Sequence, residues 1–119
     1  MGFEITEVSL RGRSWRVALA DTADLRSRGL MFVRDLGDLD GMLFVFEAER
    51  EGAFWMKNTL IPLDIAFFDG SGELVGSLGM LPCEADPCPL YDIDEPYRFA
   101  LEVPAGKLEG LADGDRIDF

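Results

Sequence analysis

The sequence predicts a mainly β fold, an antiparallel sandwich or partly closed barrel of about eight short strands with two short helices. Short apolar stretches of strand length recur along the chain, several alternate with polar residues, and Gly, Pro, Asn and Asp separate them. Hydrophobic residues make up 48% of the 119 residues, a globular composition. We therefore expect a single domain over residues 1–119.

The first elements are a hairpin and a helix. Apolar and polar residues alternate over 3–10 and 14–20, which predicts two strands joined across Arg-Gly-Arg, with one face exposed to solvent. A short helix is predicted over 22–28, because Thr22 can cap its N-terminus and Gly29 stands where it would end.

The middle of the chain is the most apolar part. After an acidic loop at 34–41, residues 42–46 are apolar without alternation, which is typical of a strand covered on both faces. A charged turn follows at 47–52. Residues 54–56 and 63–68 are then expected to form two strands joined by a tight polar connection that a proline closes.

The C-terminal half begins with a second hairpin, from 63–69 to 73–79, across an Asp-Gly-Ser-Gly turn. Four prolines oppose regular structure over 81–96, which is expected to be a loop. The remaining predicted elements are a strand over 97–103, a single helical turn started by Pro104, and a last strand over 115–119.

Charge and length exclude several classes of partner. The chain has 23 acidic and 11 basic residues, a net charge of −12, and such a surface repels nucleic acid and anionic lipid. No apolar run reaches the roughly 18 residues of a membrane-spanning helix, so we expect no transmembrane segment. The N-terminal residues lack a basic segment followed by an apolar one, so we expect no signal peptide.

The chain contains no histidine. This absence removes Ser-His-Asp and Cys-His catalysis and histidine-ligated metals, and we expect neither a metal nor a cofactor. Asp38, Asp40 and Glu47 resemble part of a calcium loop around Gly41, but the pattern needs an oxygen ligand where Leu36 stands. A solvated acidic turn is the better interpretation.

Cys83 and Cys88 are the only cysteines, and four residues separate them. Two thiolates without histidine cannot complete a zinc site, and the spacing differs from that of Cys-x-x-Cys redox pairs. A structural disulfide is the favoured interpretation, because it would hold a loop too rich in proline for backbone pairing. In a reducing cytosol the two residues would remain thiols.

Two opposite charges lie beside the apolar strands, the ammonium group of Lys57 and the carboxylate of Asp64. Burial of a lone charge is unfavourable, so the two groups either pair with each other or serve a ligand. In the first interpretation they form an ion pair that locks the turn, while Asn58 and Thr59 are ordinary turn formers.

In the second interpretation Lys57 and Asp64 form the polar floor of a pocket with aromatic walls made of Trp55, Phe54 and Phe68. The candidate ligand-binding residues are then Trp55, Lys57, Asn58, Thr59 and Asp64. Further candidates to meet Asp64 or a ligand are Arg28 and Arg98. The sequence leaves both interpretations open.

Several motifs occur together: Arg28-Gly-Leu-Met-Phe32, Gly41-Met-Leu-Phe-Val-Phe46, Phe54-Trp-Met-Lys-Asn-Thr-Leu-Ile-Pro-Leu-Asp-Ile-Ala-Phe67, Pro82-Cys83 with Asp86-Pro-Cys88, and Ala100-Leu-Glu-Val103 with Ala105-Gly106. With them the chain resembles, over nearly its whole length, the bacterial and archaeal family called domain of unknown function 192. The resemblance implies a small, mainly β domain in a family whose members often carry an export signal. It implies no activity and no catalytic residue.

Three functions are consistent with these residues. The leading hypothesis is a non-catalytic binding module for a small polar ligand, such as a saccharide. The first alternative is a hydrolase without histidine, in which Asp64 acts as general acid or base and Lys57 tunes it. The second is an accessory domain that presents a surface to another protein. The sequence leaves the cellular location open between an exported and a cytoplasmic protein.

Overall fold

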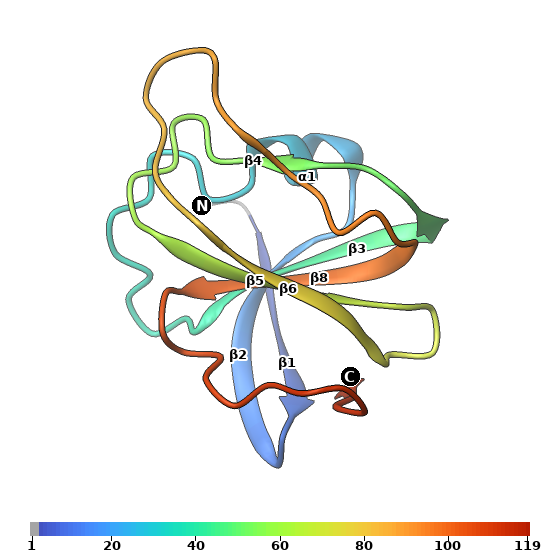
Figure 1. Cartoon of the computed structure of the whole chain (residues 1–119). Helices are drawn as coiled ribbons and strands as arrows, with labels where there is room; N and C mark the ends of the chain where they lie inside the picture. Colours follow the sequence, from blue (N-terminus) through green and yellow to red (C-terminus); the bar gives the residue numbers. More distant parts are fainter. Residues whose placement is uncertain (1–2) are drawn as a thin grey trace.

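The fold is mainly β, as predicted, and seven of its strands form one curled sheet (Figure 1). The computed structural model describes residues 3–119. Met1 and Gly2 lie outside the described part, and with them the first two residues of the N-terminal stretch in which no signal peptide is expected. The strand order in the sheet is β6-β5-β8-β3-β2-β1-β9. The strands are β1 (Glu4–Leu10), β2 (Arg13–Ala20), β3 (Gly41–Arg50), β5 (Leu63–Phe68), β6 (Leu74–Met80), β8 (Tyr97–Pro104) and β9 (Ile117–Asp118).

The two edges of this sheet approach each other at one end, which makes a partly closed barrel. The N–H of Leu74, at the start of β6, donates to the carbonyl of Asp115, and the N–H of Ile117 in β9 donates to the carbonyl of Gly72, both at 2.9 Å. These bonds use backbone groups that an open edge would leave unpaired. The barrel form of the predicted fold is therefore the one that occurs.

One pair in the sheet is parallel, whereas the sequence had predicted antiparallel strands throughout. β2 runs parallel to β3, with Val17 opposite Gly41 and Ala20 opposite Phe44. A parallel pair needs a long crossover, which here is supplied by helix α1 (Ala23–Arg28) and the acidic loop. β3 also continues to Arg50, so most of the charged turn predicted at 47–52 is strand.

The predicted pairing of 54–56 with 63–68 is wrong. β4 (Phe54–Trp55) pairs instead with β7 (Leu90–Tyr91) in a separate two-stranded sheet, while β5 joins the large sheet between β6 and β8. Local spacing suggested a hairpin, but β5 is already paired on both edges and has none left for β4. In Figure 1, β4 and α1 lie together above the large sheet.

Helix α1 forms where it was predicted. The Thr22 hydroxyl accepts the N–H of Leu25 at 3.2 Å, and Gly29 ends the helix with a φ of 49°. The second predicted helix is absent, and residues 105–110 form hydrogen-bonded turns instead. Gly106 and Gly110 adopt positive φ, which interrupts a right-handed helix. No helix in the described part of the chain has the length and apolar character needed to span a membrane.

Both faces of the central strands are buried, as the run 42–46 predicted. Alternate side chains divide into two cores. The helix-side core, which α1 and β4 help to cover, includes Met42, Phe44, Phe46, Ile65 and Phe67. The opposite core includes Leu43, Phe68, Phe99, Leu101 and Val103.

The close approach of β3 and β8 can be tested at Gly41. A Cβ atom at Gly41 would collide with the carbonyl oxygen of Glu102 and lie 2.9 Å from Val103 Cγ1, whereas at Gly79 it would meet only Asp64 Oδ1 at 3.5 Å. We expect Gly41→Ala to lower the free energy of unfolding by about 3 kcal/mol or more, and Gly79→Ala to change it by less than about 1 kcal/mol. Urea denaturation of both variants measures this. Equal effects would contradict the packing described.

Candidate functional site

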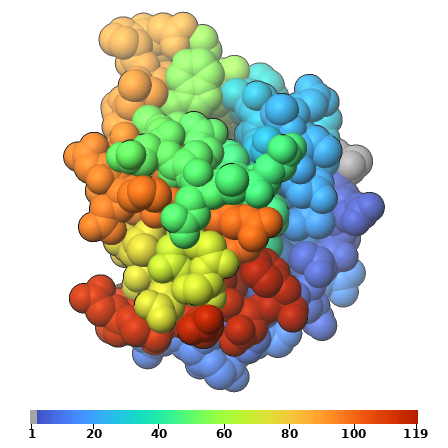
Figure 2. All heavy atoms as spheres, turned by 90° about the vertical axis from the view of Figure 1, so that its right-hand side faces the viewer, coloured from blue at the N-terminus to red at the C-terminus, as the bar shows by residue number. Residues whose placement is uncertain are grey.

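A cavity of about 550 Å³ lies on the helix side of the large sheet. β3 and β8 form its base, α1 and the residues after it form one wall, and the segment from Ala53 to Thr59 forms another. The aromatic side chains that line it are Phe44, Phe46, Phe54, Trp55 and Tyr97. Figure 2 shows the chain around β4 (green) beside the α1 segment (blue).

The aromatic walls are fixed by contacts with one another. Phe54 packs edge-on against Phe44, with ring centroids 5.1 Å apart, and against Phe67 at 5.7 Å. The Tyr97 hydroxyl donates to the carbonyl of Gly52 at 2.9 Å, and burial raises the pKa of Tyr97 above its usual range. Such edge-to-face contacts favour one arrangement of the rings, so the walls are preformed.

Two polar side chains in the cavity are buried without a protein partner. Glu102, on β8 between Met42 and Ile65 of the neighbouring strands, is 4% exposed, and Thr59 is 5% exposed. Within residues 3–119 neither side chain takes part in a hydrogen bond or ion pair. No side-chain N or O atom of these residues is both sealed from solvent and unpartnered, so both groups must open onto the cavity.

The Glu102 carboxyl has an unusual charge state. Burial raises its pKa from 4.5 to about 8. At neutral pH it is therefore mostly protonated, with one O–H to donate and oxygens to accept. Sequence analysis missed this residue, because the alternation of Phe99, Leu101 and Val103 drew attention to the other face of β8. The signal in the sequence is a glutamate between two apolar residues, Leu101 and Val103, in a run (99–103) that contains no other polar residue.

The rim of the cavity is basic, with the side chains Arg26, Arg28, Arg50 and Lys57. Arg26 Nη1 donates to the carbonyl of Val45 at 2.8 Å. The guanidinium groups of Arg26 and Arg50 each lie 4.8 Å from the centroid of the Phe46 ring. Lys57 Nζ lies 5.6 Å from the Trp55 ring.

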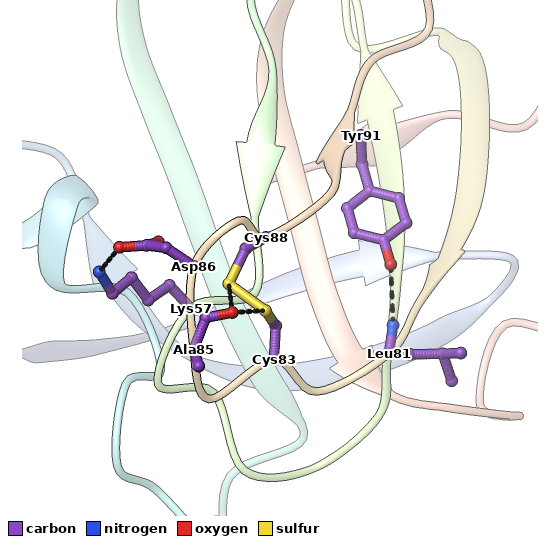
Figure 3. Close-up of a disulfide and its surroundings, with 7 residues drawn as sticks. All are labelled: Lys57, Leu81, Cys83, Ala85, Asp86, Cys88 and Tyr91. Carbon is purple, nitrogen blue, oxygen red and sulfur yellow. Dashed lines mark hydrogen bonds and ion pairs between the residues drawn. A yellow bond between two sulfur atoms is a disulfide. The ribbon is translucent and has the colours of Figure 1, made fainter.

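A disulfide-closed loop lies against one side of this rim (Figure 3). Cys83 and Cys88 are joined, and Asp86 within the ring lies 2.6 Å from Lys57 Nζ. The backbone N–H of Asn58 donates to the carbonyl of Cys83 at 2.8 Å. The loop therefore positions Lys57 through both its side chain and its backbone neighbour.

Lys57 and Asp64, which the sequence had suggested as a pair, are separate. Asp64 lies on the other face of the sheet, because side chains alternate along β5 and its neighbours Leu63 and Ile65 face the helix-side core. Its carboxylate accepts the N–H of Gly106 at 2.8 Å and so holds the turn after β8. Neither Asp64 nor Phe68 lines the cavity.

Of the other predicted candidates, four line the cavity and two, Asn58 and Arg98, do not. Trp55, Lys57, Thr59 and Arg28 line the cavity. Asn58 adopts a φ of 58°, and its backbone joins the loops at Phe32 and Cys83. Arg98 donates from Nε to the carbonyl of Phe46 at 3.1 Å and does not reach Asp64.

Comparison with known proteins gives a family and two structural relatives. The family model DUF192, described as Uncharacterized ACR, matches residues 6–119. A protein of unknown function from Novosphingobium aromaticivorans DSM 12444 is 30% identical, with a TM-score of 0.89 over 99% of this chain and 87% of that chain. A protein from Sinorhizobium meliloti 1021, described as a candidate transcription regulator, is 31% identical, with a TM-score of 0.85 over 99% and 95% of the two chains. No curated protein matches the sequence.

The state of Glu102 predicts a pH effect on stability. Between its unfolded pKa of 4.5 and its folded pKa of about 8, the native state binds more protons at this site than the unfolded state. This site therefore lowers the free energy of unfolding as pH rises through that window, by about 1.4 kcal/mol per unit at most. We expect Glu102→Gln to remove this loss of stability. The free energy of unfolding of the variant should therefore rise relative to that of the wild type as the pH approaches 8.

Urea denaturation across this pH range measures the difference. Glu109→Gln, at an exposed glutamate, is the matched control and should follow the wild type. Parallel profiles for Glu102→Gln and the wild type would show that the carboxyl ionises normally in the folded protein.

The disulfide predicts a second effect on stability. In the oxidised protein, thiol titration in denaturant without reductant should find no free thiol. The Cys83→Ser/Cys88→Ser double variant should unfold with a free energy about 2 kcal/mol lower, because the short ring no longer restricts the unfolded chain. Two reactive thiols in the untreated protein would contradict the bond.

Proposed function

The chain belongs to DUF192, a family described as uncharacterised, so we propose a function from the cavity itself: a non-catalytic binding module for a small polar ligand. The observation that carries this proposal is the pair Glu102 and Thr59, whose polar groups open onto an aromatic cavity without protein partners. No side-chain N or O atom in the described part of the chain is both sealed from solvent and unpartnered, so the hydrogen bonds of these two groups go to water or to a ligand in the cavity. A ligand bound in the cavity would supply the missing partners.

The walls support a ligand with a flat or ring-shaped body. The cavity has the volume of typical small-molecule sites, which are mostly apolar with a few directed polar groups. Trp55 is 46% exposed and, like Phe54, lines the cavity, so it offers an aromatic surface to a ligand. A saccharide is one class of molecule with the hydroxyl groups and ring faces that this surface would accommodate.

The hydrolase alternative has less support. Its candidate acid or base, Asp64, lies outside the cavity and accepts a hydrogen bond from a backbone N–H. Glycoside hydrolysis generally uses two carboxyl groups, and Glu102 is the only one among the described residues lining the cavity. Nucleic acid binding is not proposed either, although the Sinorhizobium protein is described as a candidate transcription regulator, because a net charge of −12 opposes binding to phosphates.

The test is a thermal-shift panel of sugars, organic acids and other small metabolites, followed by calorimetry on any compound that binds. A ligand at a hundred times its dissociation constant stabilises the native state by about 2.7 kcal/mol. We expect Trp55→Ala and Glu102→Leu to weaken binding by about tenfold or more, since each removes contacts or hydrogen bonds inside the cavity.

Leu90→Ala is the matched control for Trp55→Ala. Leu90 is 71% exposed and pairs with Trp55 across the small sheet, but it does not line the cavity. Its variant should bind as the wild type does. A ligand whose affinity is unchanged in both Trp55→Ala and Glu102→Leu binds elsewhere, and such a result would refute the proposed site.

A further inference from the structure

Two guanidinium groups share one aromatic ring in the cavity wall. Arg26 comes from α1 and Arg50 from the end of β3, yet both lie 4.8 Å from the centroid of Phe46. Both line the cavity. In the described part of the chain neither forms an ion pair with a carboxylate.

This arrangement is unfavourable in the absence of a counter-charge. Two like charges that contact the same ring repel each other, and a partly enclosed site weakens the screening by water. The chain has 23 acidic side chains, so a carboxylate partner would have been easy to supply. Instead, four of its 11 basic residues line this cavity, and the single acid among the lining residues is one that burial keeps mostly protonated.

The contacts that these arginines do make hold them in place without neutralising them. Cation–π contact with Phe46 holds both groups at the cavity wall, and Arg26 uses one N–H for the carbonyl of Val45. Arg50 donates to the carbonyl of Glu51 at 3.4 and 3.5 Å, which is long for a hydrogen bond. A guanidinium has five N–H donors, so each group retains donors in a geometry suited to an oxyanion. Lys57, in contrast, already has Asp86 as its counter-charge.

We propose, building on the binding function above, that the ligand is a hydroxylated organic anion, with a carboxylate or phosphate group bound by Arg26 and Arg50 and hydroxyl groups directed to Glu102 and Thr59. Arginine is a usual partner of both anions, because its planar guanidinium can donate two parallel N–H···O bonds. Protonated Glu102 can donate to a hydroxyl oxygen and accept from another O–H. Sugar acids and sugar phosphates are the simplest molecules with this combination.

Calorimetry with glucuronate, glucose 6-phosphate and glucose at one ionic strength tests this inference. We expect at least one of the two anions to bind about tenfold more tightly than glucose, because charge-assisted hydrogen bonds are the stronger ones. The preferred anion distinguishes a carboxylate site from a phosphate site. Raising the salt concentration should weaken binding of the anion and leave that of glucose unchanged.

Arg50→Gln should abolish most of the preference for the anion, because it removes one of the two guanidinium groups. Arg34→Gln is the matched control, since it changes the net charge equally at an exposed position outside the cavity. Circular dichroism should show that both variants remain folded.

The outcomes separate this inference from the proposed function. If glucose binds as tightly as both anions, or if Arg50→Gln and Arg34→Gln behave alike, the anion inference is wrong while a cavity that binds ligands stands. If none of the three probes binds but another compound does, and Trp55→Ala abolishes that binding, the ligand class is wrong and the function stands. If no compound of the wider panel binds, both proposals fail.

Discussion

Burial on both faces of the central strands is the constraint on which the rest of this structure depends. β3, β5 and β8 carry large apolar side chains on each side, and each such side chain contributes about 1.5–3 kcal/mol when fully removed from water. On one side the curled sheet, the turns after β8 and β9 provide the cover. On the other side the cover is a layer of α1, β4 and loops. That irregular layer does not fill all the space above Phe44, Phe46 and Glu102, and the cavity is what remains.

A layer built from loops lacks the continuous hydrogen-bond ladder of a sheet, so it is held by a few specific cross-links. Asn58 joins two of its loops, since its carbonyl accepts the N–H of Phe32 and its N–H donates to Cys83. The Cys83–Cys88 disulfide closes the segment 83–88, which the ion pair from Asp86 to Lys57 connects to the segment 57–58. This ion pair is exposed and contributes little by itself. These cross-links fix the rim of the cavity, while the aromatic contacts around Phe54 fix its walls.

Features set by neighbouring residues could be predicted from the sequence. The hairpins β1–β2 and β5–β6, the Thr22 cap and the two-sided burial of Met42 to Phe46 depend on the local apolar pattern and on turn and capping residues. Features set by distant pairing could not. The pairing of β4 with β7 depends on which edges other strands leave free. Asp64 supports Gly106 and lies outside the cavity because of the face of the sheet to which β5 directs it. Glu102 was missed for the same reason, because only the cover on its side of β8 makes a carboxyl at that position unusual.

The position of β8 in the strand order has a consequence for the order of assembly. β3 and β5 do not pair with each other, because Tyr97–Pro104 lies between them and β8 pairs with both. During synthesis, residues 41–68 therefore leave the ribosome with two apolar faces and with edges whose partner does not yet exist. Contacts so distant along the chain make folding slow, and unpaired apolar edges favour association with other chains. The nascent chain is therefore most exposed to aggregation just before its C-terminal fifth emerges.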